Sequence, residues 1–274
     1  MARSKPVPLG PPPQPAVQRL RVRFAKRGRL RFASHRDVAR AIERAVRRSG
    51  LPVAYSGGFN PHPKLSYAGA APTGVASEAE YFEIALTALC VPGDASDRLG
   101  AALPAGLDVI DVTEPRGGTM ADQLQVSEWR AMLPETQSEA AAAACRMFMD
   151  EGRVEVERST ATGIRRVDAR AAVLELELDP RAVDSCTGGC AILRMVVRHV
   201  TPAVRPDDVL AALRQVAGLA PPSPPLVTRL AQGLLGAAAG GLFEPGAADS
   251  AAADCDTADG GAATGGASLG SLGP

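Results

Sequence analysis

The sequence predicts an α+β protein, and three observations support this prediction. First, 46% of the 274 residues are hydrophobic and 22% are charged, which are the proportions of a globular protein. Second, short segments with an apolar residue at every second position alternate with longer segments of helical periodicity. Third, the order of these segments is β-α-β-β-α-β, and a similar order follows in the second half of the chain. This is the order of a ferredoxin-like, or split β-α-β, sandwich, so we expect two such sandwiches in tandem.

Composition divides the chain into four parts. Residues 1–16 are rich in proline, whose fixed backbone disfavours packing, and are expected to be a disordered lead-in. A joint that contains proline and glycine at residues 114–118 separates a first domain, residues 17–115, from a second domain, residues 116–235. Residues 236–274 are rich in alanine and glycine with scattered aspartates. They have too few large apolar side chains to offset the entropy of ordering, so we expect a disordered acidic tail.

The first domain is expected to begin with a strand and a helix. Leu20, Val22 and Phe24 alternate with arginines, which predicts a half-buried strand whose solvent face is basic. Ser34 is in the position of an N-cap, and a helix with one apolar stripe follows it up to Gly50. The further predicted elements are strands at residues 53–56, 65–70, 81–86 and 107–112, and a helix at residues 95–103.

The second domain has a comparable series of elements, without a residue-level repeat of the first. Its predicted strands are residues 126–133, 154–156, 173–178, 192–199 and 226–230, and its predicted helices are residues 138–149 and 206–216. His199 lies within one of these strands and is interpreted as a structural residue.

Charge is distributed very unevenly, although the formal net charge of the chain is zero. Between Arg19 and Arg48 there are 12 lysines and arginines against two acids, whereas acids dominate from residue 76 to residue 122. In the predicted helix the arginines recur at every fourth position, and this stripe consists of Arg36, Arg40, Arg44 and Arg48. A basic face of this kind favours a polyanion such as RNA. In the alternative interpretation, the arginines pair with neighbouring acids on a solvated surface.

An unusual loop, Ser-Gly-Gly-Phe-Asn-Pro-His-Pro-Lys, occupies residues 56–64. Its glycines permit a close approach of the backbone to a ligand, and its prolines stiffen the exit. The loop would therefore hold its polar side chains in a defined shape, as a grip for a ligand or phosphate. The alternative is a rigid turn that is locked by its own Asn and Ser hydrogen bonds.

Seven of the ten aromatic residues lie between Phe24 and Phe82. Aromatic rings beside arginines are suited to stacking on unpaired bases. Phe24, Phe32 and Phe82 are at apolar strand positions and are expected in the core. Tyr55 and Phe59 border the loop and are expected at the surface.

These features give two sets of candidate site residues. His35, His62 and Lys64 are candidates for catalysis, since imidazole titrates near neutrality and an ammonium group stabilises phosphate charge. The candidates for binding RNA or another anion are Ser34, Arg36, Arg40, Arg44, Arg48, Tyr55, Ser56, Gly58, Phe59, Asn60 and Lys64. Whether His35 and His62 share one site stays open.

Three segments carry a resemblance to a known family: Leu-Arg-Phe-Ala-Ser-His-Arg-Asp at residues 30–37, the loop with the preceding tyrosine at residues 55–64, and Glu-Ala-Glu-Tyr at residues 78–81. The chain resembles the bacterial radical-SAM-associated domain, a domain of unknown function. That domain is found fused to, or encoded beside, cobalamin-binding radical-SAM proteins, often near an RNase E/G gene. The resemblance covers roughly residues 17–230 and is dense over residues 19–86.

The resemblance implies a radical-SAM protein as a candidate partner, and it implies no established activity. The family signature falls on Ser34, His35, Asp37, Arg44, Tyr55, Ser56, Gly58, Phe59, Asn60, Pro61, His62, Pro63, Lys64 and Glu80. These positions are a signature rather than proven catalysts.

The chain itself is not expected to hold a metal or a cofactor. Cys186 and Cys190 form a Cys-x3-Cys pair, but Leu193 stands where a three-cysteine iron–sulfur site needs its third ligand. A zinc site lacks a second cysteine pair, although His199 could approach in space. No P-loop motif is present in the sequence. Five widely spaced cysteines, no secretory signal and no apolar run of membrane-spanning length predict a soluble cytoplasmic protein without a membrane partner.

Three functions are compatible with these features. The first is a non-catalytic RNA-binding or RNA-modification accessory protein that uses the arginine stripe for phosphates and the loop for an exposed base. The second is a metal-independent RNA-processing enzyme in which His35 or His62 acts as general acid or base. Its outline is similar to that of CRISPR repeat-processing endonucleases, by analogy of fold alone. The third is a protein-docking subunit for a radical-SAM partner. The sequence does not define the substrate or the oligomeric state.

Overall fold

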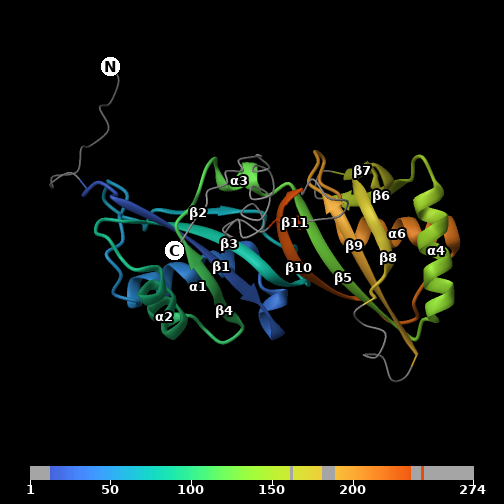
Figure 1. The fold of residues 1–274 in the computed structure, drawn as a ribbon, viewed down its shortest axis with the longest axis horizontal. Helices are drawn as coiled ribbons and strands as arrows, with labels where there is room; N and C mark the ends of the chain where they lie inside the picture. The colour runs from blue at the N-terminus through green and yellow to red at the C-terminus, as the bar shows by residue number, and fades with distance from the viewer. Residues whose placement is uncertain (1–12, 161–162, 181–188, 236–241, 244–274) are drawn as a thin grey trace, which may run out of the picture.

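The structure is a computed structural model that describes residues 13–160, 163–180, 189–235 and 242–243. It contains helices and a mostly antiparallel sheet, which confirms the prediction of an α+β fold at this level. The main sheet has nine strands and extends through both halves of the chain (Figure 1).

The first half of the chain forms four strands, three helices and a 3-10 turn. Its strands are β1 (Gln18–Lys26), β2 (Leu65–Ala68), β3 (Ala76–Leu86) and β4 (Leu107–Thr113). Its helices are α1 (His35–Arg48), α2 (Pro92–Ala102) and the short α3 (Met120–Gln123), and the 3-10 turn η1 (Gly28–Phe32) precedes α1. In the sheet, β1 lies between β4 and β3, and β2 pairs with the other edge of β3, all in antiparallel fashion.

The second half repeats this arrangement around a different central strand. Its strands are β5 (Val126–Pro134), β6 (Glu155–Thr160), β7 (Gly163–Asp168), β8 (Val173–Leu178), β9 (Cys190–Arg198), β10 (Leu226–Leu235) and β11 (Leu242–Phe243). Its helices are α4 (Ser138–Asp150), α5 (Ala169–Ala172) and α6 (Pro206–Ala217). Here β5 lies between β10 and β9, and β8 pairs with the other edge of β9, again antiparallel. Strands β6 and β7 form a separate hairpin.

The two halves join through β3 and β10. These strands run parallel and pair at Ala76 with Thr228 and at Ser77 with Arg229. The path across the sheet is therefore β4-β1-β3-β10-β5-β9-β8. Because β2 pairs with the later part of β3, β2 and β10 occupy successive stretches of the same strand edge.

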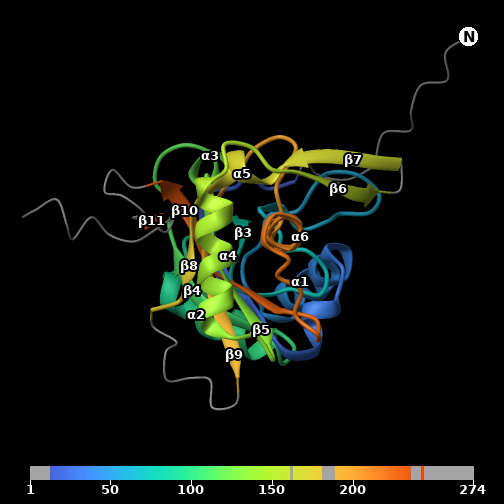
Figure 2. The same ribbon diagram turned by 90° about the vertical axis from the view of Figure 1, so that its right-hand side faces the viewer.

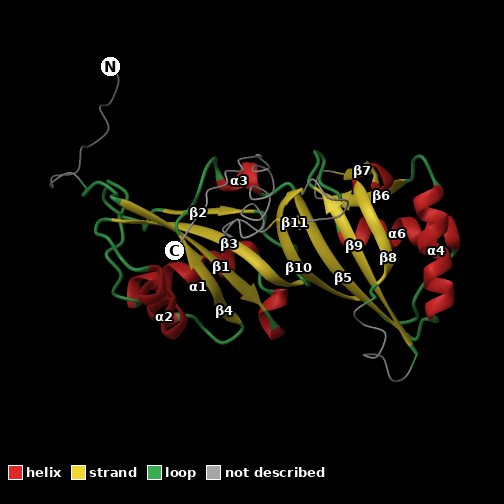
Figure 3. Cartoon of the chain, in the orientation of Figure 1, coloured by secondary structure: helices red, strands yellow, loops and turns green. Residues whose placement is uncertain are grey.

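Each half has its own hydrophobic core between its helices and its part of the sheet. In the first half, Ile42 of α1 and Leu99 of α2 pack against β1 and β3. In the second half, Phe148 of α4 and Leu213 of α6 pack against β5 and β9. Figures 2 and 3 show α1 and α2 beside the strands of the first half, and α4 and α6 beside those of the second. Most of the helices that form these cores were predicted from their apolar periodicity.

The predicted basic solvent face of β1 is wrong at its centre. Arg21 is only 2% exposed, because α3 and the residue after it cover this face of the sheet through Met120 and Leu124. The Arg21 guanidinium forms an ion pair with Glu83 at 2.8 Å and donates a hydrogen bond to Gln123. The four residues of α3 are too few to show a helical period, so the sequence did not indicate this cover.

Residues 53–56 do not form the predicted strand. Val53 and Tyr55 each make only an isolated bridge, to Leu86 and Pro63 respectively. The prolines of this region have no N–H to donate, so a continuous ladder cannot form.

Strand β10 is longer than predicted, since it continues to Leu235. Its polar residues break the apolar alternation on which the predicted bounds depend.

Parts of the predicted lead-in and tail lie outside the described residues, namely residues 1–12, 236–241 and 244–274. Within the predicted tail, Leu242–Phe243 form β11, which pairs with the end of β10. Within the described part of the chain, no helix is long and apolar enough to cross a membrane.

Candidate functional site

Helix α1 is fixed at its start by a side-chain cap and along its length by one apolar stripe. The Ser34 hydroxyl accepts a hydrogen bond from the Asp37 backbone N–H at 3.3 Å and donates one to the Asp37 carboxylate at 2.7 Å. The buried residues of the helix are Val38, Ile42, Ala45 and Val46. Since these face the core, the arginines between them face solvent.

The arginines of α1 are exposed, and three of them have no partner among the described residues. Arg48 donates to the carbonyl oxygen of Ala102 at 2.6 Å. Within the described ranges, Arg36, Arg40 and Arg44 form neither an ion pair nor a hydrogen bond. Three guanidinium groups at four-residue spacing therefore point into solvent from one helix.

Arg19 and Arg21 of β1, and Arg27 directly after it, are paired with acids instead. Arg19 and Arg21 both contact Glu83, at 3.1 and 2.8 Å. Arg27 contacts Glu78 and, at 3.1 Å, Asp108. The alternative interpretation, in which arginines pair with neighbouring acids, thus describes β1 and not the exposed face of α1.

The loop of residues 56–64 is tied at its ends and exposed at its tip. The Ser56 N–H donates to the His62 carbonyl oxygen at 2.8 Å, and the His62 N–H donates to the Ser56 hydroxyl at 3.0 Å. Between them, Gly58 has a φ of 117°, and the Phe59 side chain is 68% exposed. Asn60 and the side chain of Lys64 are exposed as well. The ends of the loop therefore fit a self-locked turn, while the tip remains accessible.

The loop lies against the second half of α1. Arg47 donates to the Pro61 carbonyl oxygen at 3.4 Å, and its guanidinium carbon is 5.7 Å from the centre of the half-buried Tyr55 ring. The His62 Nδ1 atom is 4.0 Å from a Glu43 carboxylate oxygen. These contacts place the loop and the exposed arginines on one continuous surface.

The two candidate catalytic histidines lie at different turns of α1. His35 begins the helix, and its ring meets the edge of the Tyr67 ring with the two centres 5.3 Å apart. His62 lies near Glu43, eight residues further on, which corresponds to about 12 Å along the helix axis. Burial, and then the negative charge of Glu43, raise the pKa of Tyr67. Among the described residues, the two imidazoles make neither a ring contact nor a hydrogen bond with one another.

Phe32 was expected in the core and is 64% exposed, so that prediction is wrong. The 3-10 turn η1 ends at Phe32 and interrupts the strand alternation from which its burial was inferred. The Arg31 guanidinium carbon is 4.9 Å from the centre of its ring. Phe24 and Phe82 are buried, as predicted. Two exposed phenylalanines, Phe32 and Phe59, thus accompany α1, one before its start and one on the adjacent loop.

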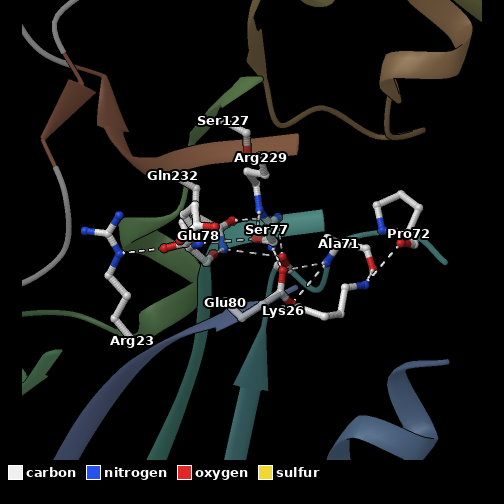
Figure 4. A network of polar contacts seen from close by, with 12 residues as sticks. Arg23, Lys26, Ala71, Pro72, Ser77, Glu78, Glu80, Ser127, Arg229 and Gln232 are labelled. Carbon is white, nitrogen blue, oxygen red and sulfur yellow. Dashed lines mark hydrogen bonds and ion pairs between the residues drawn. The ribbon is translucent and has the colours of Figure 1, made fainter. Parts of the chain in front are cut away.

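A network of buried charges lies at the junction of the two halves (Figure 4). Arg229 of β10 is 2% exposed and forms an ion pair with Glu80 of β3. Its guanidinium also donates to the Ser77 hydroxyl at 3.2 Å, the Gly69 carbonyl at 2.5 Å and Gln232 at 3.2 Å. Of these residues, only Glu80 stood out in the sequence, because an arginine within a strand carries no signal of its distant partner.

Lys26 extends this network toward the first half. Its side chain is buried, and its ammonium donates to the carbonyl oxygens of Ala71 and Pro72 at 3.3 and 3.2 Å. Glu80 accepts hydrogen bonds from the Ala71 N–H at 3.2 and 3.3 Å. Burial lowers the pKa of Lys26, Glu80 opposes this shift, and the charge of Arg229 adds to it. The network therefore fixes the segment between β2 and β3 against both halves of the sheet.

Of the two cysteines that were weighed as metal ligands, Cys186 lies outside the described residues. Cys190 is disulfide-bonded. In the described ranges, no three His, Cys, Asp or Glu side chains are grouped in a way that could hold a metal ion.

Comparison with known proteins identifies a family that the chain matches. Residues 19–206 match a family described as "Uncharacterized protein conserved in bacteria (DUF2344)". No curated protein matches the chain. The matched region includes α1, the loop and Glu80, and ends at the first residue of α6. This description covers neither a radical-SAM partner nor a cytoplasmic location, and both stay predictions.

Proposed function

The chain belongs to this family of uncharacterized bacterial proteins, and we propose that it is a non-catalytic RNA-binding or RNA-modification accessory protein. In this proposal, the exposed face of α1 and the adjoining loop form the RNA-binding surface. One observation carries the proposal. Arg36, Arg40 and Arg44 face solvent without a partner among the described residues, although acids neutralise other arginines of the same half.

The spacing of these arginines suits a phosphate backbone. Residues four apart on a helix are about 6 Å apart along its axis, so their guanidinium groups form a continuous row. Binding of phosphates along such a row releases counterions, and the affinity therefore decreases with salt. The loop approaches the same face through Arg47, Pro61 and His62.

The exposed phenylalanines support single-stranded RNA rather than a duplex. Phe59 and Phe32 each present an aromatic ring to solvent beside basic residues. Unpaired bases stack on such rings, with a contribution of about 1–3 kcal/mol for each base. Bases inside a duplex are already stacked and are not available to these rings.

Charge reversal on α1 tests the proposal. We would measure the affinity for a short single-stranded RNA over a range of salt concentrations, with the intact protein and with an Arg40→Glu/Arg44→Glu variant. We expect the variant to bind at least about tenfold more weakly than the intact protein. Its affinity should also depend less on salt: the slope of log affinity against log salt concentration should decrease in size by about 0.7 for each phosphate that the variant no longer neutralises. The matched control is Arg146→Glu/Arg165→Glu, which makes the same change in net charge at exposed positions of α4 and β7.

Three outcomes decide between the interpretations. The proposal is supported if only the α1 variant loses affinity and the bound RNA keeps its original ends. It fails if no salt-dependent binding is found, or if the control variant loses as much affinity as the α1 variant. New, discrete RNA ends that disappear with His35→Ala or His62→Ala would instead show an RNA-processing enzyme.

We also propose that each half is a ferredoxin-like unit. Numbered within each half, the four main strands follow the order 4-1-3-2, as β4-β1-β3-β2 and as β10-β5-β9-β8. In the second half, the β6–β7 hairpin and α5 would be an insertion after α4. Helices after the first and third strands support the same reading. An experimental structure of the chain tests this proposal directly.

A further inference from the structure

A pocket of about 470 Å³ opens where the two halves meet, away from the surface of α1. Its wall comes from four separate segments: the turn between β2 and β3, strand β5, the end of β9 with the chain that leads into α6, and Arg229 of β10. This volume is within the range of about 300–1,000 Å³ that is usual for small-molecule sites. The proposed RNA-binding function does not use this pocket.

The charged residues of the pocket are basic. Its lining includes Arg205, Arg229 and His199, and no Asp or Glu among the described residues belongs to it. The charge of Arg229 is offset by Glu80 behind the wall. Arg205 precedes α6 and is exposed, and its guanidinium forms no ion pair within the described part of the chain. The pocket therefore has at its edge one guanidinium, that of Arg205, without an ion-pair partner among the described residues.

One side of the pocket is polar and already ordered. The Ser127 hydroxyl is 2.7 Å from the His199 Nε2 atom, and His199 Nδ1 is 2.7 Å from the Leu124 carbonyl oxygen. A carbonyl oxygen can only accept, so Nδ1 carries a proton and, in the neutral ring, Nε2 accepts from Ser127. Burial lowers the pKa of His199, and the charge of Arg229 adds to this effect, which favours the neutral ring.

The remaining wall is apolar and includes flat rings. Trp129 contributes its indole, and the Arg229 guanidinium carbon is 5.3 Å from the centre of that ring. Pro72 and Pro206 contribute two further flat surfaces, and Val197 and Val204 add to the apolar area. Such a wall favours a planar apolar body over a sugar or a peptide backbone, whose polar groups would lose their hydration without a partner.

We propose that this junction pocket binds a small aromatic carboxylate, with its ring against the Trp129 wall and its carboxylate at Arg205. The class follows from the combination of an apolar wall, one free guanidinium and the absence of acids from the lining. Because its wall comes from both halves, the bound molecule would hold the two halves together. This inference goes beyond the proposed RNA-binding surface and does not depend on it.

Trp129 is the only tryptophan of the chain, so its fluorescence reports on this pocket alone. We would titrate the full chain with three probes of equal size: 3-phenylpropanoate, its neutral amide and the corresponding cationic amine. We expect the carboxylate to bind saturably and the amide to bind at least about tenfold more weakly than the carboxylate. The amine should show no saturation. The heat of binding provides a second measurement that does not depend on the fluorophore.

Two variants locate the carboxylate. Arg205→Gln removes the free guanidinium at an exposed position and should weaken binding of the carboxylate by about tenfold or more, without changing the binding of the amide. Arg214→Gln removes an equal charge from an exposed position further along α6 and should leave both affinities unchanged. The inference is overturned if the three probes bind equally, if none saturates, or if both variants weaken binding to the same extent.

Discussion

At the scale of single residues, the junction depends on a buried ion pair. Arg229 and Glu80 come from strands that pair in parallel through only two residue pairs, so few backbone hydrogen bonds hold this contact. The Arg229 guanidinium also donates hydrogen bonds to Ser77, Gly69 and Gln232. Charges in such a place are stable only while each retains its partner. The pair therefore makes the arrangement of β3 and β10 specific.

Removal of one partner of this pair should destabilise the protein strongly. Arg229→Met takes the guanidinium partner away from the buried Glu80 carboxylate, and we expect the free energy of unfolding to decrease by about 3–5 kcal/mol. The measurement is urea denaturation followed by far-UV circular dichroism. Adding Glu80→Gln removes the orphaned charge and keeps an acceptor for the Ala71 N–H, so the double variant should recover much of the loss. A loss below about 1 kcal/mol in the single variant would show that the pair is not essential.

His199 should make stability depend on pH. Burial lowers the pKa of His199 in the folded chain below the ordinary 6.5 that applies to the unfolded chain. At pH values between these two pKa values, the unfolded chain therefore binds more protons than the folded chain. The free energy of unfolding should therefore decrease as the pH falls from 6.5 toward the lowered pKa of the folded state, and His199 should add no further loss below it. We would compare urea denaturation of the intact protein and of His199→Gln across this interval. The variant should lose less stability, and equal losses would contradict the assignment.

At the scale of elements, β1 and α1 show how the same residue type takes two roles. Both are rich in arginine, but alternate residues of β1 lie beside the acids of β3, which are brought there by antiparallel pairing. Helix α1 packs on the sheet through its apolar stripe, and its opposite face meets no acidic strand among the described residues. Arg19 and Arg21 of the strand therefore form ion pairs, whereas the α1 arginines Arg36, Arg40 and Arg44 stay exposed without a partner among the described residues.

The cap of α1 should contribute measurably to its stability. Ser34→Ala removes the acceptor of the Asp37 N–H, and we expect the free energy of unfolding to decrease by about 1 kcal/mol. Ser34→Asn is the control, because asparagine also caps helices and should preserve most of the stability. The measurement is again urea denaturation. Equal values for the two variants would show that the cap is not what fixes the start of this helix.

At the scale of the whole molecule, two cores share one sheet. The core of the first half and that of the second are separate clusters, except that Ala71 and Val75 of the first half pack into the second. The ion pair, the parallel strand contact and these two residues connect the clusters. The molecule therefore has the cores of two domains and the continuous sheet of one.

This connection should make the halves unfold together. Trp129 fluorescence reports on the second half at the junction, whereas far-UV circular dichroism reports on all helices and strands. We expect both signals to give the same midpoint in urea denaturation of the intact protein, as in a cooperative transition. In Arg229→Met, which removes the ion pair from this connection, the two midpoints should separate. Separate midpoints in the intact protein would mean that the two cores are independent.

The sequence by itself determined most helices and strands and the positions of the exposed arginine stripe and of the exposed Phe59. Apolar periodicity located α1, α4 and α6 within one or two residues, because local spacing decides which face of a helix is buried. The arginine stripe followed from the same period, since residues four apart share a face. Phe59 was expected at the surface because it borders the loop of residues 56–64, and loops lie at the surface.

Only the tertiary structure decided which charges are free and how the halves meet. Arg21 and Arg36 look alike in sequence, yet one is buried against Glu83 and the other is exposed without a partner among the described residues. The pairing of Arg229 with Glu80 joins positions 149 residues apart, and no local pattern encodes such a contact. Burial and electrostatic pairing depend on which distant segments come together, and that is set by the packing of the whole chain.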